Sequence, residues 1–415
     1  MPDNSVELTP SQSVAMESLT GLRNVFLTGG AGTGKSFLIR HFHQDKDPKK
    51  FPILASTGAA AVIVGGRTFH SFFGLGIMEG GVAATIEKAV KNKRLVKRLQ
   101  KIEGVVIDEV SMLSSETLQA AEEIARMARS SDNPWGGLQV IAVGDFAQLP
   151  PVQRGFGRTQ TRDWAFLDPV WIWSNFEVVQ LREQTRCLDN IYMNVLNQVR
   201  TGSVTDEVKS YLDSRIVEDE PIVDCTRLFP RKNSVSKFNL SRLNELGGES
   251  IIIESITSGQ EKMIDRLLKS CPVSDKVEIK LEAFVMLLQN DPKGRFVNGS
   301  TGYVKDFDGQ KILVELLDGR RVEVERVSFT MLDAEGEVIA TLVNFPITLA
   351  WASTIHKSQG QTLDRAFVDL RRLWEPGQAY VAMSRVRSGD GLFLQGWDEG
   401  SILADSSVLD FYSSH

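Results

Sequence analysis

The feature that most constrains this chain is a glycine-rich run, GGAGTGKS at residues 29–36, that directly follows an apolar segment. Residues 25–28 predict a buried strand, and the residues after Lys35 predict a helix. A strand, a loop of this spacing and a helix form the context in which backbone N–H groups close around phosphates. The Lys35 ammonium can reach β- and γ-phosphate oxygens, and the Ser36 hydroxyl can bind Mg²⁺. The run therefore predicts an ATP site in an α/β domain rather than a turn that binds nothing.

Two further apolar segments end in side chains that suit phosphate chemistry. Residues 105–109, VVIDE, place Asp108 and Glu109 at the end of a strand, the edge where α/β sheets bind ligands. We expect Asp108 to hold Mg²⁺ through water and Glu109 to orient and deprotonate the attacking water. Residues 143–151, VGDFAQLPP, place the Gln148 amide where it can hydrogen-bond the γ-phosphate or its water. The glycine and two prolines of this segment also suit a simple turn.

Composition places the chain among ordinary globular proteins. Its 415 residues are 42% hydrophobic and 24% charged, which predicts roughly three domains. Three widely separated cysteines cannot form a disulfide framework and indicate a reducing compartment. No apolar run reaches the roughly 18 residues of a membrane helix, so we expect a cytoplasmic protein. The net charge of −6 argues against a bulk coat of nucleic acid but allows a local basic surface.

The order of apolar segments indicates how the chain is organised. Strand candidates at residues 25–28, 53–56, 104–108, 138–143 and 177–181 alternate with helical patterns, which is typical of a parallel sheet. The α/β pattern restarts near residue 189. Alternating segments with Asp-Gly turns at Asp308 and Asp318 predict small antiparallel hairpins between residues 300 and 345. Between the second and third strands, residues 84–101 are strongly basic, as a DNA-guiding surface or a solvated helix face would be.

Five motifs, in order and spacing, resemble superfamily 1 DNA helicases of the 5′-to-3′ branch, and most closely the petite-integration-frequency (PIF) helicase family. They are GGAGTGKS (29–36), DEVSM (108–112), GDFAQLPPV (144–152), TIHKSQGQTLD (354–364) and YVAMSRVRS (380–388). The resemblance implies an α/β fold with two RecA-like P-loop domains that contain parallel sheets. It also implies a small wedge insertion in the first domain and a small β-barrel inserted in the second. The expected bounds are 1–175 for the first domain, about 74–101 for the wedge, 176–274 and 346–415 for the second domain, and 275–345 for the barrel.

The resemblance also implies roles for residues around the nucleotide. Gln12 would read the adenine edge, because an amide can both donate to and accept from adenine. Arg186 would approach the γ-phosphate from the second domain, and Arg385 would be the arginine finger, although either could instead form a surface salt bridge. The expected catalytic residues are Lys35, Asp108, Glu109, Gln148, Arg186 and Arg385; the ATP-binding residues are Gln12, Gly30, Gly32, Thr33, Gly34, Lys35, Ser36 and Gly360; the Mg²⁺ ligands are Ser36 and Asp108.

DNA contacts are implied on both domains. The expected DNA-binding residues are Thr57, Thr68, Phe69, His70, Thr354, His356 and Lys357. For the phenylalanine a buried core role is favoured over DNA contact, and either histidine could instead be a buried structural imidazole. In the wedge, we expect the basic residues to guide the duplex and an apolar tip, such as Leu75 or Ile77, to split its base pairs.

The function that follows is ATP-driven movement 5′ to 3′ on single-stranded DNA, with unwinding of duplexes or G-quadruplexes in replication, repair or recombination. The implied partners are single-stranded DNA and duplex junctions, without a membrane, and the implied form is a monomer associated with a bacterial or phage nucleoid. Two alternatives stay open. One is an RNA-directed superfamily 1 helicase, and the other is a non-motor P-loop ATPase switch.

Overall fold

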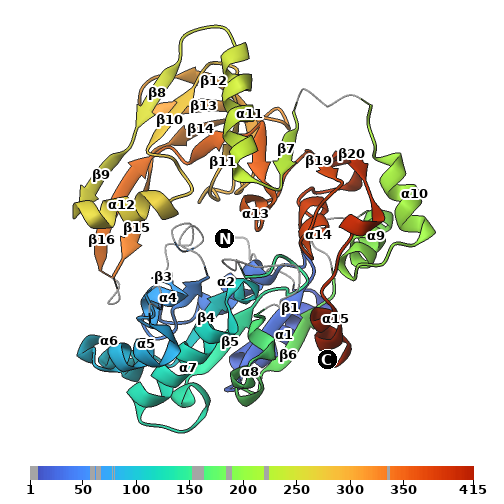
Figure 1. Ribbon diagram of the computed structural model, residues 1–415. Coiled ribbons are helices and arrows are strands. Elements are labelled where there is room, and N and C mark those ends of the chain that lie inside the picture. Colours follow the sequence, from blue (N-terminus) through green and yellow to red (C-terminus); the bar gives the residue numbers. More distant parts are fainter. Residues whose placement is uncertain are drawn as a thin grey trace, which may run out of the picture.

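The structure is a computed structural model that describes residues 8–56, 61, 67–76, 78, 80–151, 163–183, 189–218, 224–333 and 337–415. Figure 1 shows three parts: a first α/β domain at the bottom, a second at the right, and a β-rich domain at the upper left. Of the helices among these residues, none combines the length and the apolar character needed to cross a lipid bilayer.

A six-stranded sheet with the order β3-β2-β4-β5-β1-β6 organises the first domain, and all its neighbouring strands are parallel. Its strands are β1 (Val25–Gly29), β2 (Ile53–Ala55), β3 (Arg67–Thr68), β4 (Gly104–Asp108), β5 (Gln139–Val143) and β6 (Glu177–Leu181). Its helices and short turns are α1 (Pro10–Thr20), α2 (Lys35–His43), α4 (Phe69–Phe72), α5 (Gly81–Val90), α6 (Lys93–Lys101), η1 (Val110–Met112), α7 (Ser115–Arg129), η2 (Pro134–Gly137), η3 (Ala165–Leu167) and α8 (Pro169–Trp173). The central strands read as continuous apolar runs because helices cover both faces of the sheet.

A second parallel sheet, in the order β18-β7-β19-β20, forms the second domain. Its strands are β7 (Thr226–Phe229), β18 (Ala352–Thr354), β19 (Ala366–Leu370) and β20 (Leu392–Trp397). Its helices and turns are α9 (Asn190–Arg200), α10 (Asp206–Ser214), α11 (Lys232–Glu245), α13 (Ile355–Ser358), α14 (Gln378–Met383), η4 (Gly389–Gly391) and η5 (Glu399–Ser401). The expectation of two α/β domains with parallel sheets is therefore confirmed.

The inserted domain is antiparallel, as the alternating segments predict. Its five-stranded sheet consists of β14 (Arg321–Glu325), β13 (Lys311–Leu316), β12 (Thr301–Phe307), β11 (Phe284–Leu287) and β17 (Ile347–Leu349). Two smaller sheets consist of β15 (Val327–Leu332), β16 (Val338–Asn344) and β9 (Ile256–Gly259), and of β10 (Lys276–Ile279) and β8 (Ile251–Glu254), with α12 (Glu261–Ser270) packed on β16. The expected Asp-Gly turns join β12 to β13 and β13 to β14, where Gly309 and Gly319 adopt positive φ angles.

Three observations contradict the expected domain bounds. The strand β6 lies beyond residue 175, yet it pairs with β1 over five residues, so it belongs to the first domain. The antiparallel domain spans residues 251–349 rather than 275–345, because β8 pairs with β10 and β9 with β16. The last helix, α15 (Ser406–Ser413), places Val408 in the core of the first domain rather than the second. Each error involves a partner far away along the chain, which local patterns do not reveal.

The basic insertion forms two helices, α5 and α6, that pack on α7. Its apolar face, Ile86, Ala89, Leu95 and Leu99, is buried in the first-domain core. Leu75 is also buried there, with 3% of its surface exposed, so it cannot be the apolar tip that we expected. Ile77, the other expected tip residue, lies outside the described residues.

Candidate functional site

The P-loop joins β1 to α2 in the conformation that phosphate binding requires. Gly32 and Gly34 have φ angles of 85° and 89°, a left-handed backbone that favours glycine. The Lys35 ammonium donates hydrogen bonds to the carbonyls of Gly29 (2.8 Å) and Gly30 (3.0 Å). Burial lowers the pKa of Lys35, while the nearby carboxylates of Asp145, Glu109 and Asp108 act in the opposite direction. The loop thus holds its lysine over the site where phosphates would bind.

The acidic pair lies at the end of β4, beside the P-loop. Asp108 accepts a hydrogen bond from the backbone N–H of Glu109 (3.0 Å), and burial, together with the Glu109 charge, raises the pKa of Asp108 to about 7. Glu109 adopts a left-handed backbone with φ 54°, which is uncommon for a residue with a side chain and typical of functional sites. Its carboxylate accepts a hydrogen bond from the Gln359 amide of the second domain (3.2 Å). The expected general base therefore meets the second domain directly.

A cavity of about 460 Å³ collects most of the residues expected at the nucleotide. Its walls include Gly32, Gly34, Lys35, Ser36, Glu109 and Gln148 from the first domain, and Gly360 and Arg385 from the second. Arg40 and Arg387 also line it, so the cavity has four cationic side chains to receive a triphosphate. Arg385 is buried, and its guanidinium donates to the carbonyls of Val381 (2.8 Å) and Ser358 (3.3 Å). Residues that the sequence predicted at the nucleotide therefore lie on both walls of one interdomain cavity.

Two other residues expected at the nucleotide, Thr33 and Gln12, hydrogen-bond backbone carbonyls of the P-loop. Thr33 donates its hydroxyl proton to the Gly30 carbonyl (3.0 Å). Gln12 is the third residue of α1, where its Oε1 accepts from the backbone N–H of Thr9 (3.1 Å) and its Nε2 donates to the Thr33 carbonyl (3.2 Å). This capping box begins α1 and ties that helix to the P-loop. The Arg186 prediction lies outside the described residues.

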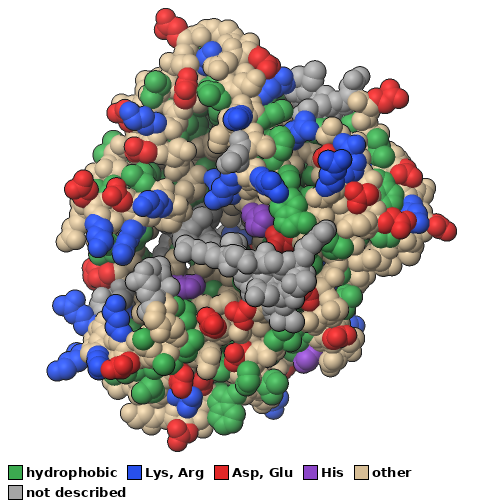
Figure 2. All heavy atoms as spheres, viewed as in Figure 1, with side chains coloured by type: hydrophobic (Ala, Val, Ile, Leu, Met, Phe, Trp, Pro, Cys, Tyr) green, Lys and Arg blue, Asp and Glu red, His purple; other side chains and the backbone are tan. Residues whose placement is uncertain are grey.

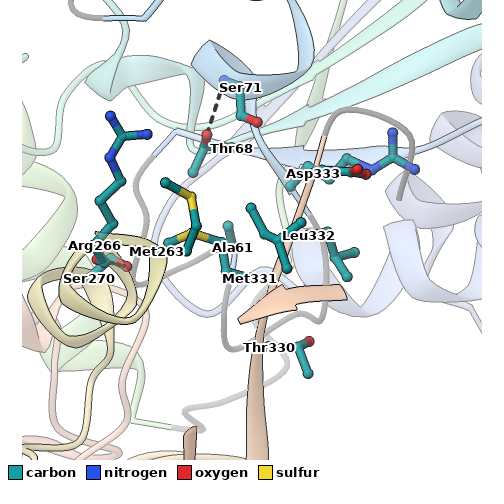
Figure 3. Close-up of a pocket in the computed structure, with 12 residues that line it drawn as sticks. Ala61, Thr68, Ser71, Met263, Arg266, Ser270, Thr330, Met331, Leu332 and Asp333 are labelled. Atoms are coloured by element: carbon teal, nitrogen blue, oxygen red, sulfur yellow. Dashed lines mark hydrogen bonds between the residues drawn. The ribbon is translucent and has the colours of Figure 1, made fainter. Parts of the chain in front are cut away.

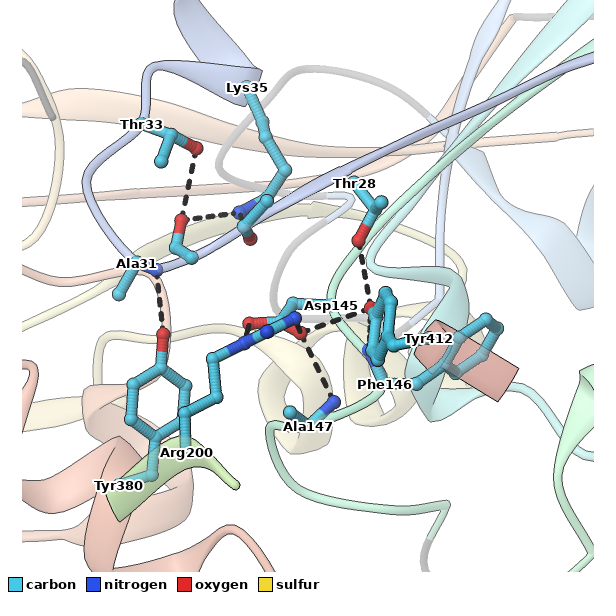
Figure 4. Close-up of polar contacts among 12 residues, drawn as sticks. Thr28, Ala31, Thr33, Lys35, Asp145, Phe146, Ala147, Arg200, Tyr380 and Tyr412 are labelled. Atoms are coloured by element: carbon cyan, nitrogen blue, oxygen red, sulfur yellow. Dashed lines mark hydrogen bonds and ion pairs between the residues drawn. The ribbon is translucent and has the colours of Figure 1, made fainter. Parts of the chain in front are cut away.

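Sequence reasoning missed a buried polar network that extends from the P-loop into the second domain (Figure 4). Tyr380 of α14 accepts a hydrogen bond from the P-loop N–H of Ala31 (2.9 Å). Arg200, at the end of α9, donates two hydrogen bonds to the Asp145 carboxylate, from Nη2 to Oδ1 (2.7 Å) and from Nε to Oδ2 (3.3 Å). Tyr412 of α15 completes the network beside Asp145. Asp145 and Tyr380 lay within recognised motifs, whereas no local pattern marked Arg200 or Tyr412.

The two segments expected to grip DNA share one local structure. Thr68 ends β3 and Thr354 ends β18, and each threonine hydroxyl caps a one-turn helix by accepting a backbone N–H, from Ser71 (3.1 Å) and Lys357 (3.0 Å) respectively. The histidine two residues after each threonine, His70 or His356, is partly exposed. The same cap thus presents a histidine at the end of a parallel strand in each domain.

Two of the expected DNA contacts are not available in this arrangement. Phe69 is fully buried and packs on Phe73, with ring centroids 4.9 Å apart, because its side chain faces the first-domain core. Thr354 is also buried, so its hydroxyl serves as the helix cap rather than as a surface donor. Lys357 is exposed, and the His356 imidazole lies 3.5 Å from the Glu375 carboxylate. Thr57 lies outside the described residues.

The inserted domain faces the first-domain segment that contains Thr68 and Ser71 across a hollow of about 240 Å³ (Figure 3). Thr68 and Ser71 line one side of this hollow, and Met263, Arg266 and Met331 line the other. On the outer face of the first domain, Lys and Arg side chains gather over α5 and α6 at the left of Figure 2. Arg98 is only partly exposed: it donates a hydrogen bond to the Phe72 carbonyl, and its guanidinium lies 5.0 Å from the Phe72 ring centroid.

Comparisons with known proteins give one consistent result. Residues 9–210 match the model of the PIF1-like helicase family. The ATP-dependent DNA helicase Pif1 of Bdellovibrio bacteriovorus is 53% identical over 412 residues, which cover 99% of this chain and 93% of that protein. A Bacteroides Pif1 structure in complex with ADP-AlF4 superposes with a TM-score of 0.86 at 28% identity, covering 98% of this chain and 97% of the other. A second structure, of Bacteroides Pif1 bound to single-stranded DNA, superposes with a TM-score of 0.67 at 28% identity, covering 98% of this chain and 97% of the other.

Proposed function

The chain belongs to the PIF1-like helicase family, and from that membership we propose that this ATP-dependent DNA helicase moves 5′ to 3′ along single-stranded DNA and opens duplexes or G-quadruplexes ahead of it. The observation that carries the proposal is the cavity whose walls come from both α/β domains. A nucleotide between two domains favours their closure, and hydrolysis removes that constraint. The chemical cycle thereby becomes a cycle of domain movement.

The cavity residues suit phosphoryl transfer. Lys35 would exchange its carbonyl acceptors for β- and γ-phosphate oxygens, and Glu109 would take the proton of the attacking water. Gln148 would hydrogen-bond the γ-phosphate or that water. Arg385 would turn toward the γ-phosphate as an arginine finger, a role that contributes about 10³ to 10⁵ in rate. We keep Gln12 as the adenine reader and Arg186 as a second γ-phosphate arginine on the family resemblance.

The residues also fit a magnesium ion. The Ser36 hydroxyl and the Asp108 carboxylate offer the oxygen donors that Mg²⁺ prefers. Among the described residues, no group of three or more His, Cys, Asp or Glu side chains is arranged to hold a metal ion. When bound, Mg²⁺ supplies positive charge against the β- and γ-phosphates.

Movement requires that each domain hold the strand separately. The capped turns after β3 and β18 supply two equivalent sites, with His70 on the first domain and with His356 and Lys357 on the second. Because these turns belong to different domains, opening and closing of the cleft would change the distance between the two grips. The exposed basic residues of α5 and α6 would guide the duplex toward the point of separation.

Both cavity walls come from one chain, which supports action as a monomer. We place this activity at single-stranded DNA and duplex junctions, in replication, repair or recombination on the nucleoid of the cytoplasm. The proposed activity does not involve a membrane.

Strand displacement on two matched DNA duplexes, one with a single-stranded 5′ tail and one with a 3′ tail, tests the proposal. We expect ATP-dependent unwinding of the 5′-tailed substrate alone. Unwinding of only the 3′-tailed substrate would reverse the direction, and unwinding of neither would reject duplex opening. Stimulation of ATP hydrolysis by RNA rather than DNA oligonucleotides would favour the RNA-directed alternative, and no stimulation by either would favour the switch.

A further inference from the structure

The chain passes from the second domain back to the first after η5, and the C-terminal helix α15 packs into the first-domain core. Figure 1 shows it beside β1 and β6. Val408 is buried there, and the Phe411 ring lies 4.7 Å from that of Phe166 and 5.5 Å from that of Phe146. This packing carries Tyr412 to the ends of β1 and β5, directly behind the P-loop.

The Tyr412 hydroxyl makes three hydrogen bonds at that position. It lies 2.8 Å from the Thr28 hydroxyl, 3.1 Å from the backbone nitrogen of Phe146 and 3.1 Å from the Asp145 carboxylate. A phenol has one proton and two lone pairs. The Phe146 N–H can only donate, and a carboxylate can only accept, so the tyrosine proton goes to Asp145. Thr28 then donates to the remaining lone pair, and the hydrogen-bonding capacity of Tyr412 is filled.

These partners belong to two loops that both reach the nucleotide cavity. Thr28 directly precedes Gly29, the first residue of the P-loop, and Phe146 lies two residues before Gln148. Asp145 also accepts the backbone N–H of Ala147 (3.1 Å), which shapes the start of the Gln148 loop. A single hydroxyl group therefore links the P-loop to the loop that carries Gln148 (Figure 4).

The second domain supports the same loop. Arg200 neutralises the buried Asp145 carboxylate, and its guanidinium lies 4.6 Å from the centroid of the Tyr412 ring. Gly377, at the start of α14, lies against the loop so closely that a Cβ atom there would lie 2.5 Å from the Gln148 carbonyl oxygen. Burial and the Asp145 charge raise the pKa of Tyr412 above its usual range, so the hydroxyl keeps the proton it donates.

We propose that Tyr412 and Arg200 are positioning residues for ATP hydrolysis, which hold the Gln148 loop at a fixed place relative to the P-loop. Neither side chain touches the reacting atoms. Their contribution is to keep the Gln148 amide aligned with the γ-phosphate when the two domains close. The C-terminal helix is then a component of the ATPase site and not only a packing element.

The test is Tyr412→Phe in the full chain, which removes the hydroxyl and retains the ring. We expect kcat for single-stranded-DNA-stimulated ATP hydrolysis to fall about tenfold, the size of effect that losing hydrogen bonds to charged and buried groups produces. The KM for ATP and the Kd for single-stranded DNA should stay within about twofold, because the groups that bind them are intact. A purely structural role would lower the melting temperature without this separation of kcat from KM.

Phe411→Leu is the matched control, since it weakens the packing of the same helix but retains the hydroxyl. We expect a lower melting temperature with kcat within about twofold of the wild type at 25 °C. Thr28→Val removes one hydrogen-bond donor to Tyr412, and combining it with Tyr412→Phe should cause little further loss of kcat. Wild-type kcat in Tyr412→Phe, or an equal loss in Phe411→Leu, would overturn the inference. Failure of wild-type protein to hydrolyse ATP would instead count against the proposed function.

Discussion

The Gln359 amide of the second domain donates a hydrogen bond to the Glu109 carboxylate of the first, with 3.2 Å between Nε2 and Oε2. Glu109 already adopts a left-handed backbone that aims its side chain into the interdomain cavity. The expected general base is therefore oriented from both sides of the domain interface. Its orientation depends on the relative position of the domains, which links chemistry to movement within a single pair of residues.

We expect Gln359→Ala to lower kcat for DNA-stimulated ATP hydrolysis about five- to tenfold, the usual effect of losing one hydrogen bond to a charged group. The KM for ATP should change little, because Gln359 is not among the groups that would hold the phosphates. Steady-state kinetics with saturating single-stranded DNA measures both constants. A change confined to KM would show that Gln359 binds nucleotide instead of orienting Glu109.

Lys35→Ala and Glu109→Gln should separate binding from chemistry. Removing Lys35 eliminates the one lysine that lines the described cavity wall, so we expect neither tight ATP binding nor measurable hydrolysis. Glu109→Gln preserves shape and removes the base, so we expect nearly normal ATP affinity and a kcat reduced about 10²- to 10⁴-fold. The two variants are distinguished by measuring the equilibrium affinity for ATP and the rate of ATP hydrolysis in a single turnover. Near-normal turnover by Glu109→Gln would remove Glu109 from the role of base.

The basic surface of α6 should contribute to the salt dependence of DNA binding. Lys93 and Lys97 are exposed, whereas Arg98 supports Phe72, so the double variant Lys93→Ala/Lys97→Ala removes charge without disturbing the core. If each lysine contacts one duplex phosphate, the slope of log Kobs against log salt should become shallower by about 0.9 per residue. The double variant Arg23→Ala/Lys49→Ala, which alters exposed charges elsewhere on the first domain, should retain the wild-type slope. Equal slopes for both double variants would exclude α6 from the duplex path.

His70 should give protein stability a measurable pH dependence. Burial lowers its pKa below the usual 6.5, so the native imidazole stays neutral where the unfolded chain takes up a proton. As the pH falls through about 6.5, the unfolded state binds more protons than the native state, and the stability of the protein decreases. We expect the melting temperature to fall further between pH 7.5 and pH 5.5 in the wild type than in His70→Gln. Equal decreases would show that His70 is solvated like a free imidazole.

The sequence was most informative where function depends on short segments. Lys35, Glu109, Gln148 and Arg385 line one cavity, as their motifs predicted. The first three follow β1, β4 and β5, whose carboxyl ends share one edge of the first-domain sheet, whereas Arg385 follows α14 of the second domain. It was least informative where function depends on contacts between distant segments. Arg200 pairs with Asp145 across 55 positions, and Tyr412 reaches Asp145 across 267. Neither residue stands in a local pattern, so only the packing of α9 and α15 reveals their position.

Gly377 lies at the contact between α14 and the loop that carries Gln148. Its φ angle is 77°, and an added Cβ atom would lie 2.5 Å from the Gln148 carbonyl and 2.6 Å from that of Ala147. Both obstacles are backbone atoms, so Gly377→Ala must displace the loop or separate the domains. We expect kcat for ATP hydrolysis to fall at least tenfold while single-stranded DNA still binds, measured by coupled ATPase assay and fluorescence anisotropy. Gly319→Ala, in a hairpin of the inserted domain with φ 83° and open space around the added Cβ, carries similar backbone strain and should leave kcat unchanged. If both variants hydrolyse ATP at the wild-type rate, close contact at Gly377 is not required for the reaction.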